Sequence, residues 1–367
     1  MWIDLARFLT LLVCLGPLLG TGQAWAENRY IFAAHDPAAS GGKNIESLVI
    51  YSSTDIAVAR PLIDSFQDRF PKSRVVYHDL QSLDIYERVI EETDRAGATA
   101  DLVFSSAMDL QLKLVNDGYA VRWRSAATAA LPKWANWRNE AFGVTYEPAV
   151  IVYHKPSFVG RTPPRTRSAL TEVLLQGDRM FFGRVATYDV ERSGLGFLFL
   201  ARDQEHYPDI WRLVSAMGTS GVKLYSNSAA IIDRVAEGKF VLGYNILGSY
   251  AKNKAAENPD LGIILPEDYT VVLSRIAFIP RAARSRELGG RFLDFLLSEA
   301  GQRTLAERTG LNAILPAVEG PNTASALRAR LGARLRPIRV GPGLLVYLDQ
   351  AKRARLIKRW NQALGGR

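Results

Sequence analysis

Short apolar runs and helical apolar patterns alternate along most of the chain, and their order predicts an α/β protein. Residues 48–51 form an apolar, β-branched run that is typical of a buried strand. After residue 55, apolar side chains recur at the spacing of an amphipathic helix. Residues 102–104 and the segment after them repeat this design. Strands that alternate with helices favour a mostly parallel sheet with helical crossover connections.

A turn rich in hydroxyl groups connects the strand to the helix in both places. The first turn contains Ser52, Ser53 and Thr54, and the second contains Ser105 and Ser106. Turns at the carboxyl ends of strands line the crevice where open α/β sheets bind ligands. The N–H groups of a helix N-terminus can receive an anion there. The alternative is that these side chains only cap their helices, but the repetition of the design favours a binding site.

A second α/β run follows and predicts a second lobe. The roughly 340 residues that follow the first 26 exceed what a single core usually holds. The expected strands are residues 150–153, 180–187, 221–225, 240–244, 263–266 and 270–280. The expected helices begin at residue 195 and cover residues 229–236, 288–297 and 301–307.

Polar groups again follow two strands of this second run. Arg192, Ser193 and Gly194 follow one strand, and Ser226 and Ser228 follow the next. An arginine can hold an anion with two parallel hydrogen bonds, and the other groups lie where helix N-termini are expected. The alternatives are a solvated surface arginine and ordinary helix caps.

The first residues have the features of an export signal. Arg7 precedes the apolar residues 8–19, and Ala24, Trp25 and Ala26 form a small-x-small cleavage site. The apolar run is shorter than the ~20 residues of a spanning helix. We therefore expect cleavage after Ala26, a mature protein in the periplasm, and a loose leader at residues 27–46. Cys14, the only cysteine, would leave with the signal.

Positive charge is concentrated at the end of the chain. The net charge is +9, yet residues 324–367 carry eleven Lys and Arg side chains against Asp349 alone. The rest of the chain is therefore near neutral, and residues 321–367 form a basic C-terminal extension. This extension could dock on a membrane partner or on anionic lipids. Alternatively, it packs along one lobe through an apolar stripe of Leu344, Leu345, Leu348, Leu356 and Trp360.

Several of these segments together resemble a known family. The segments at residues 48–55, 100–109, 142–155 and 239–245 match its pattern, and FLDFLLSEAGQ at residues 292–302 is its most specific mark. Over residues 48–317 the chain resembles periplasmic solute-binding proteins of ABC importers, in the group with ferric-ion, phosphonate, hexose-phosphate and phosphoglycerate-sensing binders.

The resemblance implies a two-lobe, type II binding protein. Each lobe would be a mostly parallel sheet flanked by helices, and two crossing strands would form the hinge. Lobe 1 would comprise residues 47–148 and 271–320, and lobe 2 would comprise residues 149–270. The first hinge is expected at Tyr146, Glu147 and Pro148.

The resemblance also implies a function. A small anionic solute, phosphorylated or carboxylated, would be captured between the lobes, with Tyr244 and Asn245 at the family's ligand-contacting position in lobe 2. The expected partner is an inner-membrane ABC permease or a sensor kinase. We expect a monomer without a cofactor and without a nucleic-acid partner.

Two other function classes compare less well with the sequence. A ferric-iron-binding protein of this family would use adjacent tyrosines, whereas Tyr244 and Tyr250 stand six positions apart and no Tyr-Tyr pair occurs. A hydrolase would need a nucleophile with a base, and the chain has no G-x-S-x-G or H-E-x-x-H motif and no cysteine outside the signal. We therefore expect a binding protein rather than an enzyme, with iron binding as the alternative.

Overall fold

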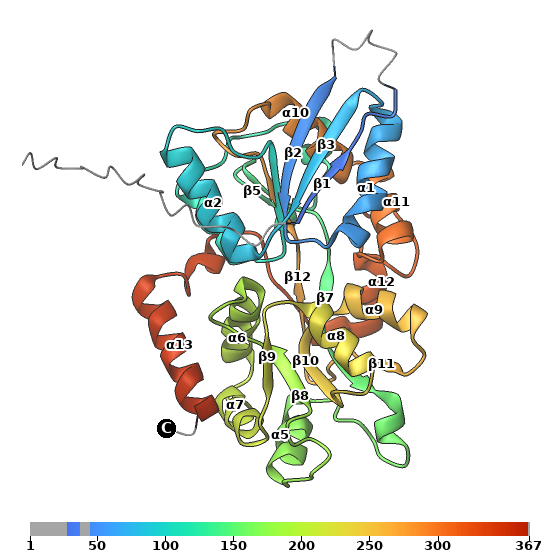
Figure 1. The fold of residues 1–367 in the computed structure, drawn as a ribbon, viewed down its shortest axis with the longest axis vertical. Helices are drawn as coiled ribbons and strands as arrows, with labels where there is room; N and C mark the ends of the chain where they lie inside the picture. The colour runs from blue at the N-terminus through green and yellow to red at the C-terminus, as the bar shows by residue number, and fades with distance from the viewer. Residues whose placement is uncertain (1–27, 37–44, 366–367) are drawn as a thin grey trace, which may run out of the picture.

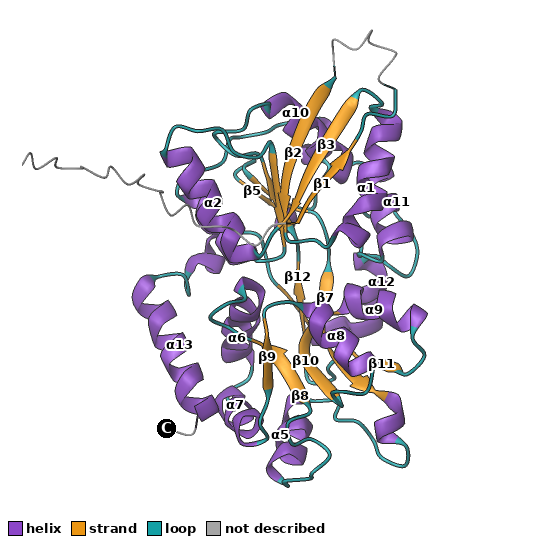
Figure 2. Ribbon diagram, in the orientation of Figure 1, coloured by secondary structure: helices purple, strands orange, loops and turns teal. Residues whose placement is uncertain are grey.

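The computed structural model has two α/β lobes, one above the other, with a waist between them (Figure 1). It describes residues 28–36 and 45–365. The predicted export signal lies outside these residues. Each lobe has a sheet flanked by helices (Figure 2), which confirms the predicted fold class.

Lobe 1 contains a seven-stranded sheet in the order β1-β3-β2-β4-β13-β6-β5. Its strands are β1 (Asn28–Phe32), β2 (Glu46–Ser52), β3 (Ser73–Asp79), β4 (Leu102–Ser105), β5 (Asn136–Trp137), β6 (Ala141–Gly143) and β13 (Ile276–Phe278). Its helices are α1 (Ile56–Arg69), α2 (Ser82–Asp94), α3 (Met108–Asn116), α4 (Ala126–Ala129), α10 (Arg286–Leu297), α11 (Glu299–Thr304) and α12 (Ala324–Leu331). The centre of the sheet, β3-β2-β4, is parallel as expected, and the outer pairs are antiparallel.

Lobe 2 has a second sheet in the order β14-β12-β7-β10-β8-β9, with β11 paired to β7. Its strands are β7 (Glu147–His154), β8 (Val185–Tyr188), β9 (Lys223–Tyr225), β10 (Leu242–Leu247), β11 (Leu261–Ile264), β12 (Thr270–Leu273) and β14 (Leu335–Pro337). Its helices are α5 (Arg167–Leu175), α6 (Gly194–His206), α7 (Ile210–Thr219), α8 (Ser228–Ala236), α9 (Gly248–Glu257) and α13 (Gln350–Gly365). Strand β8 begins five residues later than the sequence pattern indicated, because residues 178–183 form consecutive turns.

The core of lobe 1 lies between its sheet and the helices α1 and α10. Phe66 of α1 is fully buried and packs its ring edge-on against Phe292 and Phe295 of α10, with ring centroids 4.8 and 5.7 Å apart. The specific segment at residues 292–302 therefore acts in packing, because its aromatic side chains close this core.

Two short connections cross between the lobes. The first runs from β6 to β7 through Tyr146, and the second runs from β12 to β13 through Ser274 and Arg275. The apolar run at residues 270–280 is thus two strands in different sheets rather than one. The first crossing lies at Tyr146, Glu147 and Pro148, and their action as a hinge stays a prediction.

Both ends of the described chain depart from the sequence-based expectation. The leader was expected to be loose, but Asn28–Phe32 is strand β1, which pairs antiparallel with β3 along its whole length. The basic extension is integrated into both lobes. Helix α12 contributes Leu327 and Leu331 to the core of lobe 1, β14 pairs with β12, and α13 lies on lobe 2.

The expected apolar stripe of the extension faces the protein. Leu344, Leu348, Leu356 and Trp360 are buried, and the last three belong to the core of lobe 2 that also contains α7. The packing alternative is therefore the one the structure adopts for this face. Within the described residues, no helix combines the length and apolar character that a membrane crossing requires.

Candidate functional site

A pocket lies between the two lobes at the carboxyl ends of their central strands, and we call it the interlobe pocket. Lobe 1 contributes Ser53, Asp55, Asp79, Leu80, Gln81, Ser82 and Ser106. Lobe 2 contributes Tyr188, Arg192, Ser193, Gly194, Leu195, Ser226, Asn227, Ser228, Leu247 and Tyr250. The strand-to-helix turns of β2, β3, β4, β8 and β9 all reach it, as the rule for open α/β sheets predicts.

The lobes touch beside this pocket because of a glycine. A Cβ atom placed on Gly194 would lie 2.7 Å from the Leu110 Cδ1 atom and 3.2 Å from the Ala107 Cβ atom, both on α3 of lobe 1 or at its start. Only a glycine lets the N-terminus of α6 approach lobe 1 this closely. The two lobes are therefore in direct contact at this edge of the pocket.

The serines of the first turn divide between packing and pocket. Ser52 is fully buried; its Oγ atom donates to the Phe104 carbonyl oxygen at 2.7 Å and accepts from the Thr54 amide at 3.1 Å. Thr54 is also buried, and its hydroxyl accepts a hydrogen bond from Arg275 at 2.8 Å. Ser53 lines the pocket. Two of the three predicted hydroxyls thus hold the turn, and that of Ser53 belongs to a residue lining the pocket.

The second turn divides in the same way. Ser105 is fully buried, and its Oγ atom lies 3.0 Å from the Ser53 Oγ atom. Ser106 lines the pocket, and its amide donates to the Ser53 Oγ atom at 3.2 Å. The two turns therefore brace one another, and this bracing fixes the positions of Ser53 and Ser106.

Lobe 2 presents two helix N-termini to the same pocket. Ser193 caps α6 by accepting from the Gly196 amide at 3.1 Å, and Asn227 caps α8 by accepting from the Ala230 amide at 2.9 Å. Ser228 contacts the Tyr188 hydroxyl through a hydrogen bond. The first N–H groups of both helices remain available in this region, and their dipoles favour a negative group.

Arg192 is an exposed residue on the rim of the pocket. Its loop is held by Asp189, whose Oδ1 atom accepts hydrogen bonds from the amides of Glu191 and Arg192 at 3.0 and 3.3 Å. Among the described residues, no carboxylate forms a salt bridge with the Arg192 guanidinium, which leaves its donors available for an anionic ligand.

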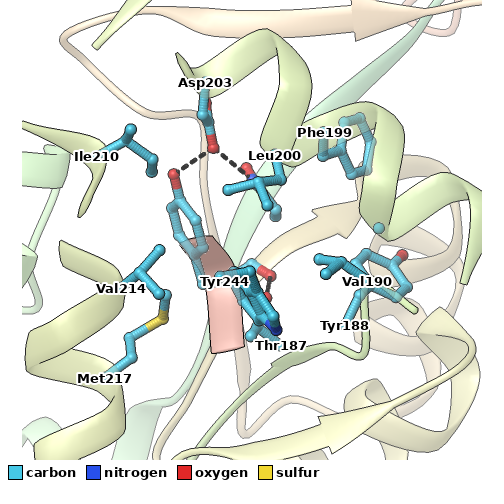
Figure 3. A pocket seen from close by; sticks show the side chains of 13 residues that line it. Thr187, Tyr188, Val190, Phe199, Leu200, Asp203, Ile210, Val214, Met217 and Tyr244 are labelled. Atoms are coloured by element: carbon cyan, nitrogen blue, oxygen red, sulfur yellow. Dashed lines mark hydrogen bonds between the residues drawn. The ribbon is translucent and has the colours of Figure 1, made fainter. Parts of the chain in front are cut away.

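Two predicted residues of β10 lie elsewhere. Tyr244 and Asn245 line a small enclosed pocket inside lobe 2, where both side chains donate to Asp203 at 2.7 and 2.6 Å (Figure 3). The apolar side chains of Val214 and Met217 from α7 close this space. Neither residue lines the interlobe pocket, so the structure does not bring them together with the serines and Arg192.

The tyrosines of the iron alternative are likewise separated. Tyr244 belongs to the enclosed pocket of lobe 2, whereas Tyr250 lines the interlobe pocket and accepts a hydrogen bond from the Asp55 amide at 3.0 Å. Burial raises the pKa of both phenols above the ordinary value. Within the described part of the chain, no three His, Cys, Asp or Glu residues are grouped as a metal site would require.

The sequence analysis missed two carboxylates of the pocket, Asp55 and Asp79. Burial raises the pKa of Asp55, opposed by Arg275 and reinforced by Asp233. Burial and the negative charge of Asp55 raise the pKa of Asp79 to about 7, although the Ile56 amide donates to its carboxylate. The sequence could have indicated Asp79, because this residue ends strand β3 at the same sheet edge as the serines.

Comparisons with known proteins agree with this geometry. Residues 86–329 match the family model described as bacterial extracellular solute-binding protein. The substrate-binding protein of an ABC transporter from Agrobacterium tumefaciens is 52% identical, covers 93% of this chain and 99% of its own, and superposes with a TM-score of 0.89. No curated protein matched.

More distant structures share the fold. The periplasmic binding protein AfuA from Actinobacillus pleuropneumoniae, with fructose-6-phosphate bound, is 17% identical with a TM-score of 0.73, over 88% of this chain and 99% of its own. Iron-bound HitA from Pseudomonas aeruginosa is 16% identical with a TM-score of 0.68, over 87% and 99%. At these identities the likeness concerns the arrangement of the two lobes.

Proposed function

The chain belongs to the bacterial extracellular solute-binding proteins, and from that membership we propose that it captures a small organic solute with an acidic group for an ABC importer. The acidic group would be a phosphate, phosphonate or carboxylate held between the lobes in the periplasm, after removal of the export signal. The fructose-6-phosphate bound by AfuA is a solute of this kind.

One observation carries this proposal. The lobe 2 wall of the interlobe pocket combines Arg192 with the N-termini of α6 and α8, and the lobe 1 wall adds the hydroxyls of Ser53 and Ser106. An anion there receives hydrogen bonds from neutral donors and from one charged group, which together suit a phosphate or carboxylate. Iron is less well supported, because Tyr244 and Tyr250 occupy separate pockets.

Binding would also stabilise the contacts between the two lobes. Tyr250 of lobe 2 reaches the Asp55 amide of lobe 1, and Gly194 allows α6 to contact α3. A solute that contacts both walls adds to these interlobe contacts and favours closure about the two crossing connections.

The proposal is tested by thermal unfolding with a panel of phosphorylated, phosphonylated and carboxylated metabolites, with ferric citrate as the rival probe. A ligand at 100 times its dissociation constant stabilises the fold by ~2.7 kcal/mol. We expect at least one acidic solute to reach this effect. Stabilisation by ferric citrate, but neither by citrate without iron nor by any other acidic solute, would contradict the proposal.

Arg192→Ala sharpens this test. The variant should weaken binding of the best acidic solute by about 1.5–3 kcal/mol, the contribution of a hydrogen bond to a charged group. Arg212→Ala is the matched control, because Arg212 is another exposed arginine of lobe 2 and does not line the pocket. Unliganded melting temperatures should agree for both variants. Equal affinity of Arg192→Ala and the control would remove Arg192 from the site.

A further inference from the structure

The interlobe pocket has two chemically different ends. Arg192 and two helix N-termini lie on the wall of lobe 2, whereas Asp55 and Asp79 lie on the wall of lobe 1. A solute that carried only negative charge would satisfy the first end and would be repelled by the second. The two carboxylates at the second end therefore indicate a further chemical group on the solute, besides its acidic group.

The two carboxylates lie close enough to interact electrostatically, since the charge of Asp55 contributes to the raised pKa of Asp79. Asp79 accepts a hydrogen bond from the Ile56 amide, and the Asp55 side chain makes no capping hydrogen bond to α1. In the part of the chain that the structure describes, no Lys, Arg or His forms a salt bridge with either carboxylate. Half-buried, like-charged carboxylates of this kind are costly unless one of them keeps a proton or a cation joins them.

The charged groups around this pair do not supply that cation. Arg275 lowers the pKa of Asp55, but its guanidinium donates to Thr54 and to both oxygens of Glu147, which is its counter-charge. Asp233 of α8 faces Asp55 and adds negative charge, while its own partner is Lys254 at 2.7 Å. Arg192 stands on the rim of the same pocket, among the groups of lobe 2.

We propose that the solute carries an amine as well as an acidic group, with the ammonium between Asp55 and Asp79 and the acid toward Arg192 and the N-termini of α6 and α8. This inference rests on the proposed function and names the solute class of the same pocket. An ammonium offers three donors to the carboxylate oxygens, and its positive charge offsets their repulsion. Tyr250, beside Asp55, would place an aromatic ring of lobe 2 near the cation.

Matched pairs of probes separate this inference from the proposed function. The pairs are β-alanine with propionate, aminoethylphosphonate with ethylphosphonate, and glucosamine phosphate with glucose phosphate. In each pair the acid is kept and the amine is removed or replaced, and binding is measured by calorimetry and thermal unfolding. We expect the strongest ligand to be an amine-bearing member that binds at least roughly tenfold tighter than its partner, which corresponds to 1.4 kcal/mol.

Three outcomes of this panel are decisive. If the amine-free acids bind as tightly as their partners, the inference is wrong and the proposed function stands. If no acid of either kind binds, both are wrong. A preference for the amine-bearing members supports both.

Variants then locate the amine. Asp55→Asn and Asp79→Asn should each weaken binding of the amine-bearing ligand at least roughly 30-fold. This is the lower end of the loss in affinity when one partner of a charge pair is truncated. Their affinity for the amine-free partner should stay the same or rise. Asp64→Asn, which changes another half-buried carboxyl further along α1 and outside the pocket, is the control and should bind like wild type. An unchanged preference for the amine in both pocket variants would overturn the inference.

Discussion

Thr54 and Asp55 are neighbours in the sequence, yet they belong to two regions that differ in whether their charged side chains form salt bridges. Thr54 accepts a hydrogen bond from Arg275, whose guanidinium also donates to both oxygens of Glu147 at 2.8 and 3.3 Å in the crossing region. Both charged side chains are completely buried. Asp55 faces the interlobe pocket, where the described chain offers it no salt-bridge partner.

This difference indicates which charges hold the fold and which are left for a ligand. At the crossing, Glu147 also accepts from the hydroxyls of Thr145 and Ser249, so every oxygen has a donor. A fully satisfied pair of this kind fixes where the lobes join. In the pocket, Asp55, Asp79 and Arg192 form no salt bridge with any residue that the structure describes, and charges without a counter-charge are typical of a binding site.

The largest effect is expected at the crossing pair. Glu147→Gln leaves the buried Arg275 without its counter-charge and should lower the free energy of unfolding by about 3–5 kcal/mol. Chemical denaturation measures this loss. The double variant Glu147→Gln with Arg275→Met should recover part of it, because the unpaired charge is then gone. A single variant as stable as wild type would show that the crossing does not depend on this pair.

A smaller effect of opposite sign is expected at Asp79. Its pKa in the folded protein is about 7 against an ordinary 3.8, so within that window the folded chain holds a proton that the unfolded chain has released. The free energy of unfolding therefore falls as the pH rises through this window. Asp79→Asn removes that loss, and after allowance for solvent screening it should stabilise the unliganded protein by about 1–2 kcal/mol near pH 8.

Near pH 4 the same variant should be nearly as stable as wild type, because Asp79 is then protonated in the folded state and still partly protonated in the unfolded state. Asp109 of α3, whose pKa burial also raises to about 7, contributes the same pH trend to both proteins and cancels in the comparison. Thermal unfolding across this pH range is the measurement. A stability gain at pH 4 that equals the gain at pH 8 would assign the effect to packing instead.

The smallest effects separate the paired serines. Ser106→Ala should weaken solute binding by ~1 kcal/mol, the net value of one hydrogen bond, and leave the unliganded melting temperature nearly unchanged. Ser52→Ala should instead lower stability by a similar ~1 kcal/mol, since its hydroxyl holds the turn to the Phe104 carbonyl. Calorimetry and thermal unfolding of both variants test this. The opposite assignment of the two losses would reverse the roles given to Ser52 and Ser106.

Much of the fold could be predicted from the sequence because strand and helix periods are local. Residues 48–66 became β2 and α1, and the two crossings fell close to the expected hinge. The leader strand Asn28–Phe32 could not be found in this way, because its polar neighbours look like a loop and its stability comes from pairing with β3. The division of the run at residues 270–280 depends on tertiary pairing in the same way.

The site was harder to predict than the fold. Adjacent residues of a turn point to opposite sides, so hydroxyl content alone could not separate Ser53 from Ser52 or Ser106 from Ser105. Tyr244 followed from the family resemblance, whereas in this structure its hydroxyl donates to Asp203 inside lobe 2. Asp79 could have been predicted in the same way as the serines, since it also ends a strand of the same sheet.

The basic C-terminal extension adds a third connection between the two lobes. It leaves lobe 1 after α12, adds β14 to the sheet of lobe 2, returns to lobe 1 where the Val340 amide donates to the Trp134 carbonyl at 3.0 Å, and ends as α13 on α7. At its end, Gly218 admits the Leu364 backbone so closely that a Cβ atom there would lie 2.2 Å from the carbonyl oxygen. Two connections alone leave the lobes free to twist as well as to bend. Because a third segment of the chain contacts both lobes, we expect the lobes to move relative to one another in fewer directions than two connections alone would permit.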